Sequence, residues 1–192
     1  MSVVSTNTTS GSLPTVLLQH WEELQGLWQM RSTAIMDSEY VASDISALDA
    51  RIEAHVDGLL VGGEASIPVL QEGLEGEGAA VAAAAYVLLR LKDKQAAELV
   101  VEAMHKAEAG QLEALGLALR QSNLSLITDQ LAAMYEQGPA LLAAAAAEAF
   151  ADHGRLSKDA GRLKEFFGDE DPEVRKAAWR ITALVDANGG SR

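Results

Sequence analysis

The stretch that decides the fold is "DPEVRKAAWR", residues 171–180. Asp171 has the short, oxygen-bearing side chain that caps a helix, and Pro172 suits the first helical position because its missing N–H costs nothing there. The apolar positions that follow recur at the spacing of one helix face: Val174, Ala177, Ala178 and Ile181. The stretch therefore predicts a capped helix whose small apolar face packs against a neighbour.

Segments of the same kind recur upstream at intervals of about thirty residues. They begin at Gly78, Gly110 and Gly138, and Pro139 can be superposed on Pro172. Shorter amphipathic stretches lie before them and supply the other helix of each pair, at residues 65–74, 94–107, 124–137 and 157–168. Helix pairs in tandem predict an all-α chain built as an α-solenoid.

The N-terminal part predicts a helical hairpin at residues 15–62. Its first apolar stripe comprises Leu17, Trp21, Leu24, Trp28 and Ile35, and its second comprises Ile45, Leu48, Ile52, Val56 and Leu59. Gly62 and Gly63 end the second helix. We expect a disordered leader at 1–14, an array of about four helix pairs at 63–186 and a disordered tail at 187–192.

Two alanine runs, 82–85 and 143–147, lie inside predicted helices. Because small side chains let neighbouring helices approach closely, we expect both runs to be buried. Glutamate at Ala145 would then bury an unpaired charge and loosen the array.

Composition narrows the classes of partner. The net charge of −13 repels nucleic-acid phosphates, so it favours either simple solubility or a basic protein partner. The chain has no cysteine, and its first residues carry neither a basic segment nor a long apolar run. We therefore expect a cytoplasmic protein that binds neither nucleic acid nor membrane.

No motif predicts catalytic, cofactor-binding or metal-binding residues. The histidines at 20, 55, 105 and 153 have no recognised metal spacing, and we expect His55 to bond a backbone group or carboxylate at a helix edge. Asp152-His153 with Ser157 lacks a nucleophile elbow, and the glycine-rich segments lack the lysine of a phosphate loop. The sequence therefore favours a binding protein over an enzyme.

Two stretches resemble known sequences. "DPEVRKAA" resembles the second-helix signature of HEAT repeats, and "LDARIEAHVDGLLVGGEASIPVL" at 48–70, preceded by "HWEELQGLWQMRSTAI", resembles an uncharacterised bacterial HEAT-like family found among type VI secretion genes. Members of that family are longer, so the chain resembles a shortened one.

The resemblance implies HEAT-like helix pairs and a non-enzymatic role near a secreted toxin effector. That role is either an immunity protein that neutralises the toxin or an adaptor that helps to load it, and the acidic charge favours immunity against a basic toxin. A HEAT-like lyase or cofactor chaperone is the enzymatic alternative.

The expected partner-binding residues lie on the turns between paired helices and on the last helix. The turns should align along one edge as a negative stripe, comprising Glu75, Glu77, Glu108, Asp169, Glu170 and Asp171. Arg175 and Trp179 lie beside the buried face of the last helix, and Trp179 either packs on Phe166 or Phe167 or anchors a partner. Whether the chain is a monomer or a dimer stays open.

Overall fold

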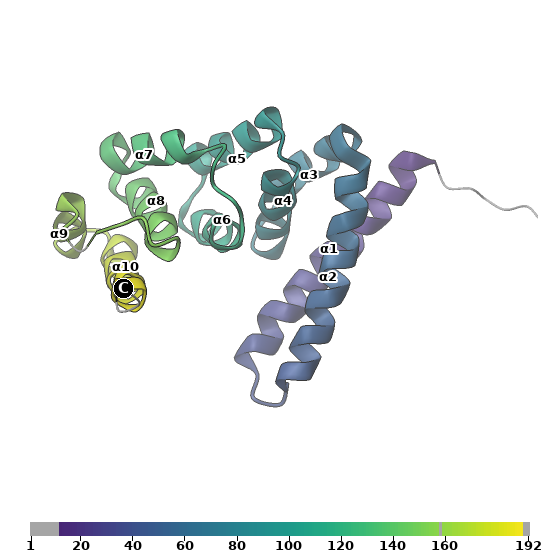
Figure 1. Ribbon diagram of the computed structural model, residues 1–192, viewed down its shortest axis with the longest axis horizontal. Helices are drawn as coiled ribbons and strands as arrows, with labels where there is room; N and C mark the ends of the chain where they lie inside the picture. The colour runs from purple at the N-terminus through teal and green to yellow at the C-terminus, as the bar shows by residue number, and fades with distance from the viewer. Residues whose placement is uncertain (1–11, 158, 190–192) are drawn as a thin grey trace, which may run out of the picture. The chain divides into compact units, whose positions relative to one another are not determined.

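The computed structural model describes residues 12–157 and 159–189, which are helical with connecting turns and contain no strand (Figure 1). The all-α prediction is therefore confirmed for this part of the chain. The chain consists of two compact units, Met1–Val69 and Leu70–Arg192, and each is described by itself.

The first unit is a helical hairpin of α1 (Leu13–Met36) and α2 (Ala42–Gly62), followed by a 3₁₀ turn η1 (Gly63–Ser66). Both predicted stripes meet at its core, where the buried side chains include Leu17, Trp21, Leu24, Trp28, Leu48, Ile52, Val56 and Leu59. Ile35 and Ile45 are exceptions, because Ile35 has 51% of its surface exposed and Ile45 is only partly buried. The buried stripe of α1 passes instead through Leu27 and Ala34, one residue earlier, so that Ile35 faces outward.

The second unit contains two layers of helices, as Figure 1 shows. A row of packed helices runs from α4 (Ala79–Arg90) through α6 (Ala109–Gln121) and α8 (Ala140–Asp152) to α10 (Pro172–Gly189). The other layer comprises α5 (Lys94–Lys106), α7 (Thr128–Gln137) and α9 (Gly161–Phe167), and each packs on the helix that follows it. A short helix, α3 (Ile67–Leu74), lies in sequence between η1 and α4, and the boundary between the two units falls within it.

The stretch that predicted the fold has the expected structure. The Glu173 N–H donates to Asp171 Oδ1 at 2.8 Å, so Asp171 caps α10, and Pro172 is its first residue. The predicted face, Val174, Ala177, Ala178 and Ile181, is buried against α8 and α9.

The ends of the elements differ from the predicted bounds. Leu13 and Pro14 already belong to α1, and residues 1–11 of the expected leader lie outside the described residues. At the other end, α10 continues through residues 187–189, which the sequence assigned to the tail. The reason is Asn188, whose Nδ2 donates to the carbonyls of Ala151 and Asp152 at 2.8 and 3.2 Å and so fastens the last turn to the end of α8.

The expectation of burial is confirmed for every alanine of the two runs except Ala145. Ala82–Ala85 are at most 1% exposed, and Ala143, Ala144, Ala146 and Ala147 are fully buried. Ala145 is partly exposed because it turns toward the open face of α8. The predicted effect of a glutamate therefore belongs to Ala144 rather than to Ala145.

We expect Ala144→Glu to destabilise the second unit by more than about 3 kcal/mol, because it places an unpaired carboxylate inside a closely packed row. Ala145→Glu is the matched control, with the same substitution one residue away and access to solvent. Urea unfolding followed by circular dichroism measures both variants. Equal stability of the two would contradict the packing described here.

Candidate binding groove

A groove of about 380 Å³ crosses the row of helices in the second unit. Its lining residues come from one side of α6, the middle of α8 and the first turns of α10. Gly116, Ala145, Ala149 and Ala177 contribute only small side chains to the surface. The groove exists because these residues let the helices approach while leaving the space above them open.

An ionic cluster lies in this groove and joins all three helices. Glu148 of α8 is 7% exposed. Arg180 of α10 donates to it through Nε, at 3.1 Å to Oε1, and through Nη2, at 2.9 Å to Oε2. Arg120 of α6 donates to Glu148 Oε1 from its Nη2 atom. Such charge-assisted bonds offset the desolvation of the buried carboxylate.

The cluster contains more hydrogen-bond donors than acceptors. Two guanidinium groups share one carboxylate, which leaves one net positive charge among the three side chains. The Nε atom of Arg120 is buried and has no hydrogen-bond partner. This buried Nε atom is out of a ligand's reach, but the side chains of Arg120 and Arg180 are 33% and 36% exposed and both line the groove.

Sequence reasoning missed this cluster, although one signal was present. Apart from Asp152 at its end, Glu148 is the only charged residue of α8, in a helix otherwise built from alanine, leucine and phenylalanine. A charge in such a helix predicts buried cationic partners. The sequence does not say that those partners come from α6 and α10.

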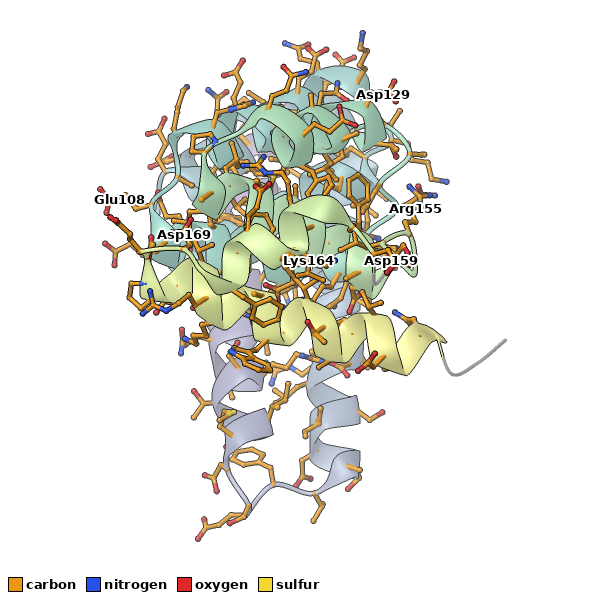
Figure 2. The ribbon with its side chains drawn as sticks, turned by 90° about the vertical axis from the view of Figure 1, so that its left-hand side faces the viewer. Glu108, Asp129, Arg155, Asp159, Lys164 and Asp169 are labelled. Carbon is orange, nitrogen blue, oxygen red and sulfur yellow. The ribbon has the colours of Figure 1, made fainter. Side chains whose placement is uncertain are left out.

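The groove is lined by none of the eight predicted partner-binding residues, although some of its lining residues are close to them in sequence. Ala109 and Gly110, which follow Glu108, line it, as do Glu173 and Lys176 near the start of α10. Figure 2 shows Glu108 and Asp169 at the same edge of the second unit and Asp129, Arg155 and Asp159 at the opposite edge.

Glu75 and Glu77 flank Gly76, whose carbonyl accepts a hydrogen bond from Gln111 Nε2 at 3.1 Å. This bond ties their turn to the start of α6, beside Glu108. The turn between α7 and α8 has no such carboxylate. There Arg162 donates to the carbonyls of Tyr135 and Gly138.

Several predicted binding residues also hold the turn before α10 together. Asp169 Oδ1 accepts the Asp171 N–H at 2.9 Å, and Arg175 Nη1 donates to the carbonyls of Asp169 and Glu170 at 2.7 and 2.8 Å. Asp169, Asp171 and Arg175 therefore have structural roles of their own. Glu170 keeps an exposed side chain.

Trp179 has the packing arrangement considered from the sequence, and it is also largely exposed. Its ring packs edge-on against Phe167, with ring centroids 4.9 Å apart and planes at 78°. Even so, 69% of the residue is exposed, on the side of α10 away from the groove.

The contact of His55 differs from the one expected, because its Nδ1 lies 3.2 Å from Nδ1 of His20 in the first unit rather than beside a backbone group or carboxylate. Burial, and then the neighbouring His20, lower the pKa of His55 below its usual 6.5. His153 does not pair with Asp152 or Ser157, and its Nε2 lies 2.9 Å from the Leu119 carbonyl oxygen.

In residues 12–157 and 159–189, no helix is long and apolar enough to cross a membrane. Comparison of the chain with protein-family models, with curated proteins and with solved structures finds no match. A function therefore has to be inferred from the groove and its charged residues.

The ionic cluster can be tested by removing its charges in steps. Arg120→Met with Arg180→Met keeps most of the side-chain volume but leaves Glu148 buried without a cation. We expect a loss of about 3 kcal/mol in the free energy of unfolding, measured in urea. Adding Glu148→Met should restore most of that loss, because an apolar trio has no charge to desolvate. A triple variant no more stable than the double variant would mean that Glu148 is not a buried charge that needs the two arginines.

Proposed function

We propose that this protein is a non-catalytic, cytoplasmic binding scaffold that acts as an immunity protein and neutralises a basic secreted toxin of a type VI secretion system. Its second unit would be an α-solenoid of HEAT-like helix pairs. The observation that carries the proposal is the groove over α6, α8 and α10, whose lining includes Ala109, the residue directly after Glu108.

The packing of the second unit supports the repeat interpretation. The helices α5, α7 and α9 each pack on their successor, and the successors pack on one another. Each pair therefore buries its apolar face on a neighbouring pair, as in helical repeat proteins. In such arrays, the row formed by the second helices of the pairs commonly offers an extended binding surface.

The groove has groups for both parts of a basic polypeptide segment. Cationic side chains of the partner would meet Glu113 and Glu173 on its walls and Glu108 at its end. The backbone carbonyls of the segment would meet the partly exposed guanidinium groups of Arg120 and Arg180, which line the groove. The small residues beneath allow a backbone to come close.

The net charge of −13 would also steer a basic partner toward the molecule before contact. A secretion adaptor is the second candidate function. It is favoured by the size of the groove, because about 380 Å³ suits a short extended segment and need not cover an active site.

The acidic edge should control affinity for a basic partner. We expect Glu108→Lys with Glu170→Lys to weaken binding at least tenfold and to reduce its salt dependence, because both carboxylates are exposed, Glu108 directly precedes the groove residue Ala109, and Glu170 follows Asp169 at the same edge as Glu108. The partner to use is the product of the neighbouring gene, and the measurement is titration calorimetry at two salt concentrations. Asp169 is left unchanged in this test because its side chain holds its own turn together.

Asp129→Lys with Asp159→Lys is the matched control, with the same charge change on the opposite edge of the unit. Equal weakening by the two pairs would mean that only net charge matters and would contradict a site at the edge. Neutralised toxicity in the complex distinguishes an immunity protein from an adaptor, whose partner would stay active.

Trp179 should contribute to binding more than to folding. We expect Trp179→Ala to weaken the complex about tenfold or more, as truncated tryptophan anchors do. Its contact with Phe167 is worth only about 1 kcal/mol, so the urea midpoint should change little. Unchanged affinity would restrict the partner to the groove side of α10.

A further inference from the structure

The histidine pair of the first unit has a geometry that the proposed function does not use. His20 of α1 and His55 of α2 are both partly buried, and their Nδ1 atoms lie 3.2 Å apart. The rings meet edge to face, with centroids 5.3 Å apart and planes at 67°. The two nitrogens thus face each other across the seam of the hairpin.

We propose that His20 and His55, together with Glu23, form a site for a divalent transition-metal ion such as Zn²⁺, which joins α1 to α2. Histidine nitrogens bind zinc at about 2.0–2.1 Å, so two ligands at a tetrahedral angle lie about 3.3–3.4 Å apart. The observed 3.2 Å is close to that separation and requires only a small adjustment of the rings.

Glu23 is the third ligand. It follows His20 by one helical turn, and its charge already acts on His55. As the side chains stand, no group of three His, Cys, Asp or Glu residues is arranged to hold a metal in the part of the chain that the structure describes. The carboxylate therefore has to rotate toward the pair, and water completes the coordination.

An open cavity beside the pair gives that carboxylate and the waters room. It has a volume of about 500 Å³ and is lined by Val16, Gln19, His20, Glu22, Glu23 and His55. Two of these residues are carboxylates, which favour a cation. Arg51, the nearby cation, is exposed to solvent.

Gly58 of α2 leaves the space that the His20 ring occupies. A Cβ atom at this position would lie 2.6 Å from Cε1 and Nε2 of His20. A larger residue at this point of α2 would therefore shift the His20 ring from its present position.

A hydrogen bond between the two imidazoles also explains the short contact, so metal binding itself has to be measured. The full-length protein, stripped with a chelator, is titrated with Zn²⁺ by calorimetry, and Co²⁺ is used to record ligand-field bands. We expect one ion per chain, a higher melting temperature of the hairpin and no response to Mg²⁺.

Matched variants assign the ligands. His20→Ala and His55→Ala should each weaken Zn²⁺ binding at least tenfold, and Glu23→Gln should weaken it several-fold. His105→Ala, an exposed histidine of the second unit, should leave it unchanged. Circular dichroism in the presence of chelator confirms folding, and His20→Gln serves if the alanine variant does not fold.

Two results would overturn the site: absence of stoichiometric Zn²⁺ and Co²⁺ binding by the wild-type chain, or binding that persists in the His20→Ala, His55→Ala double variant. Gly58→Ala adds a test of geometry. It should weaken the metal as a histidine substitution does, although both histidines remain, because its methyl group displaces the His20 ring.

Discussion

The second unit depends on the close approach of α6, α8 and α10, which alanine makes possible. With side chains of one carbon at Ala143, Ala144 and Ala147, α8 can pack closely on its neighbours. Such a core has few large rings to specify how the helices are placed. Specificity comes instead from polar contacts between the helices, above all from Glu148 with Arg120 and Arg180.

This ionic cluster connects stability with binding. Glu148 has to be paired because it is buried, and the arginines that pair with it bring more donors than one carboxylate can use. Both arginines line the groove, and each side chain is about one-third exposed there. The need to pair the buried Glu148 has therefore placed two arginine side chains in the groove.

The sequence predicted local structure well because its signals are local. The cap at Asp171, the stripes of the hairpin and the glycines at its end depend on residues within a few turns, and all of them appear in the structure. Ala145 and Ile35 were misplaced because a shift of one residue on a helix turns a side chain from the core to solvent. The contact between His20 and His55 could not be derived, since it depends on the register of two helices.

Asn188 has a consequence for how the last helix opens. Its amide fastens the final turn of α10 to the end of α8, while Asp171 holds the first turn. A helix fixed at both ends cannot fray gradually, so α10 has to separate from α8 as one piece. Its backbone amides should therefore share a single opening free energy, and protection from hydrogen exchange should extend almost to the end of the described chain.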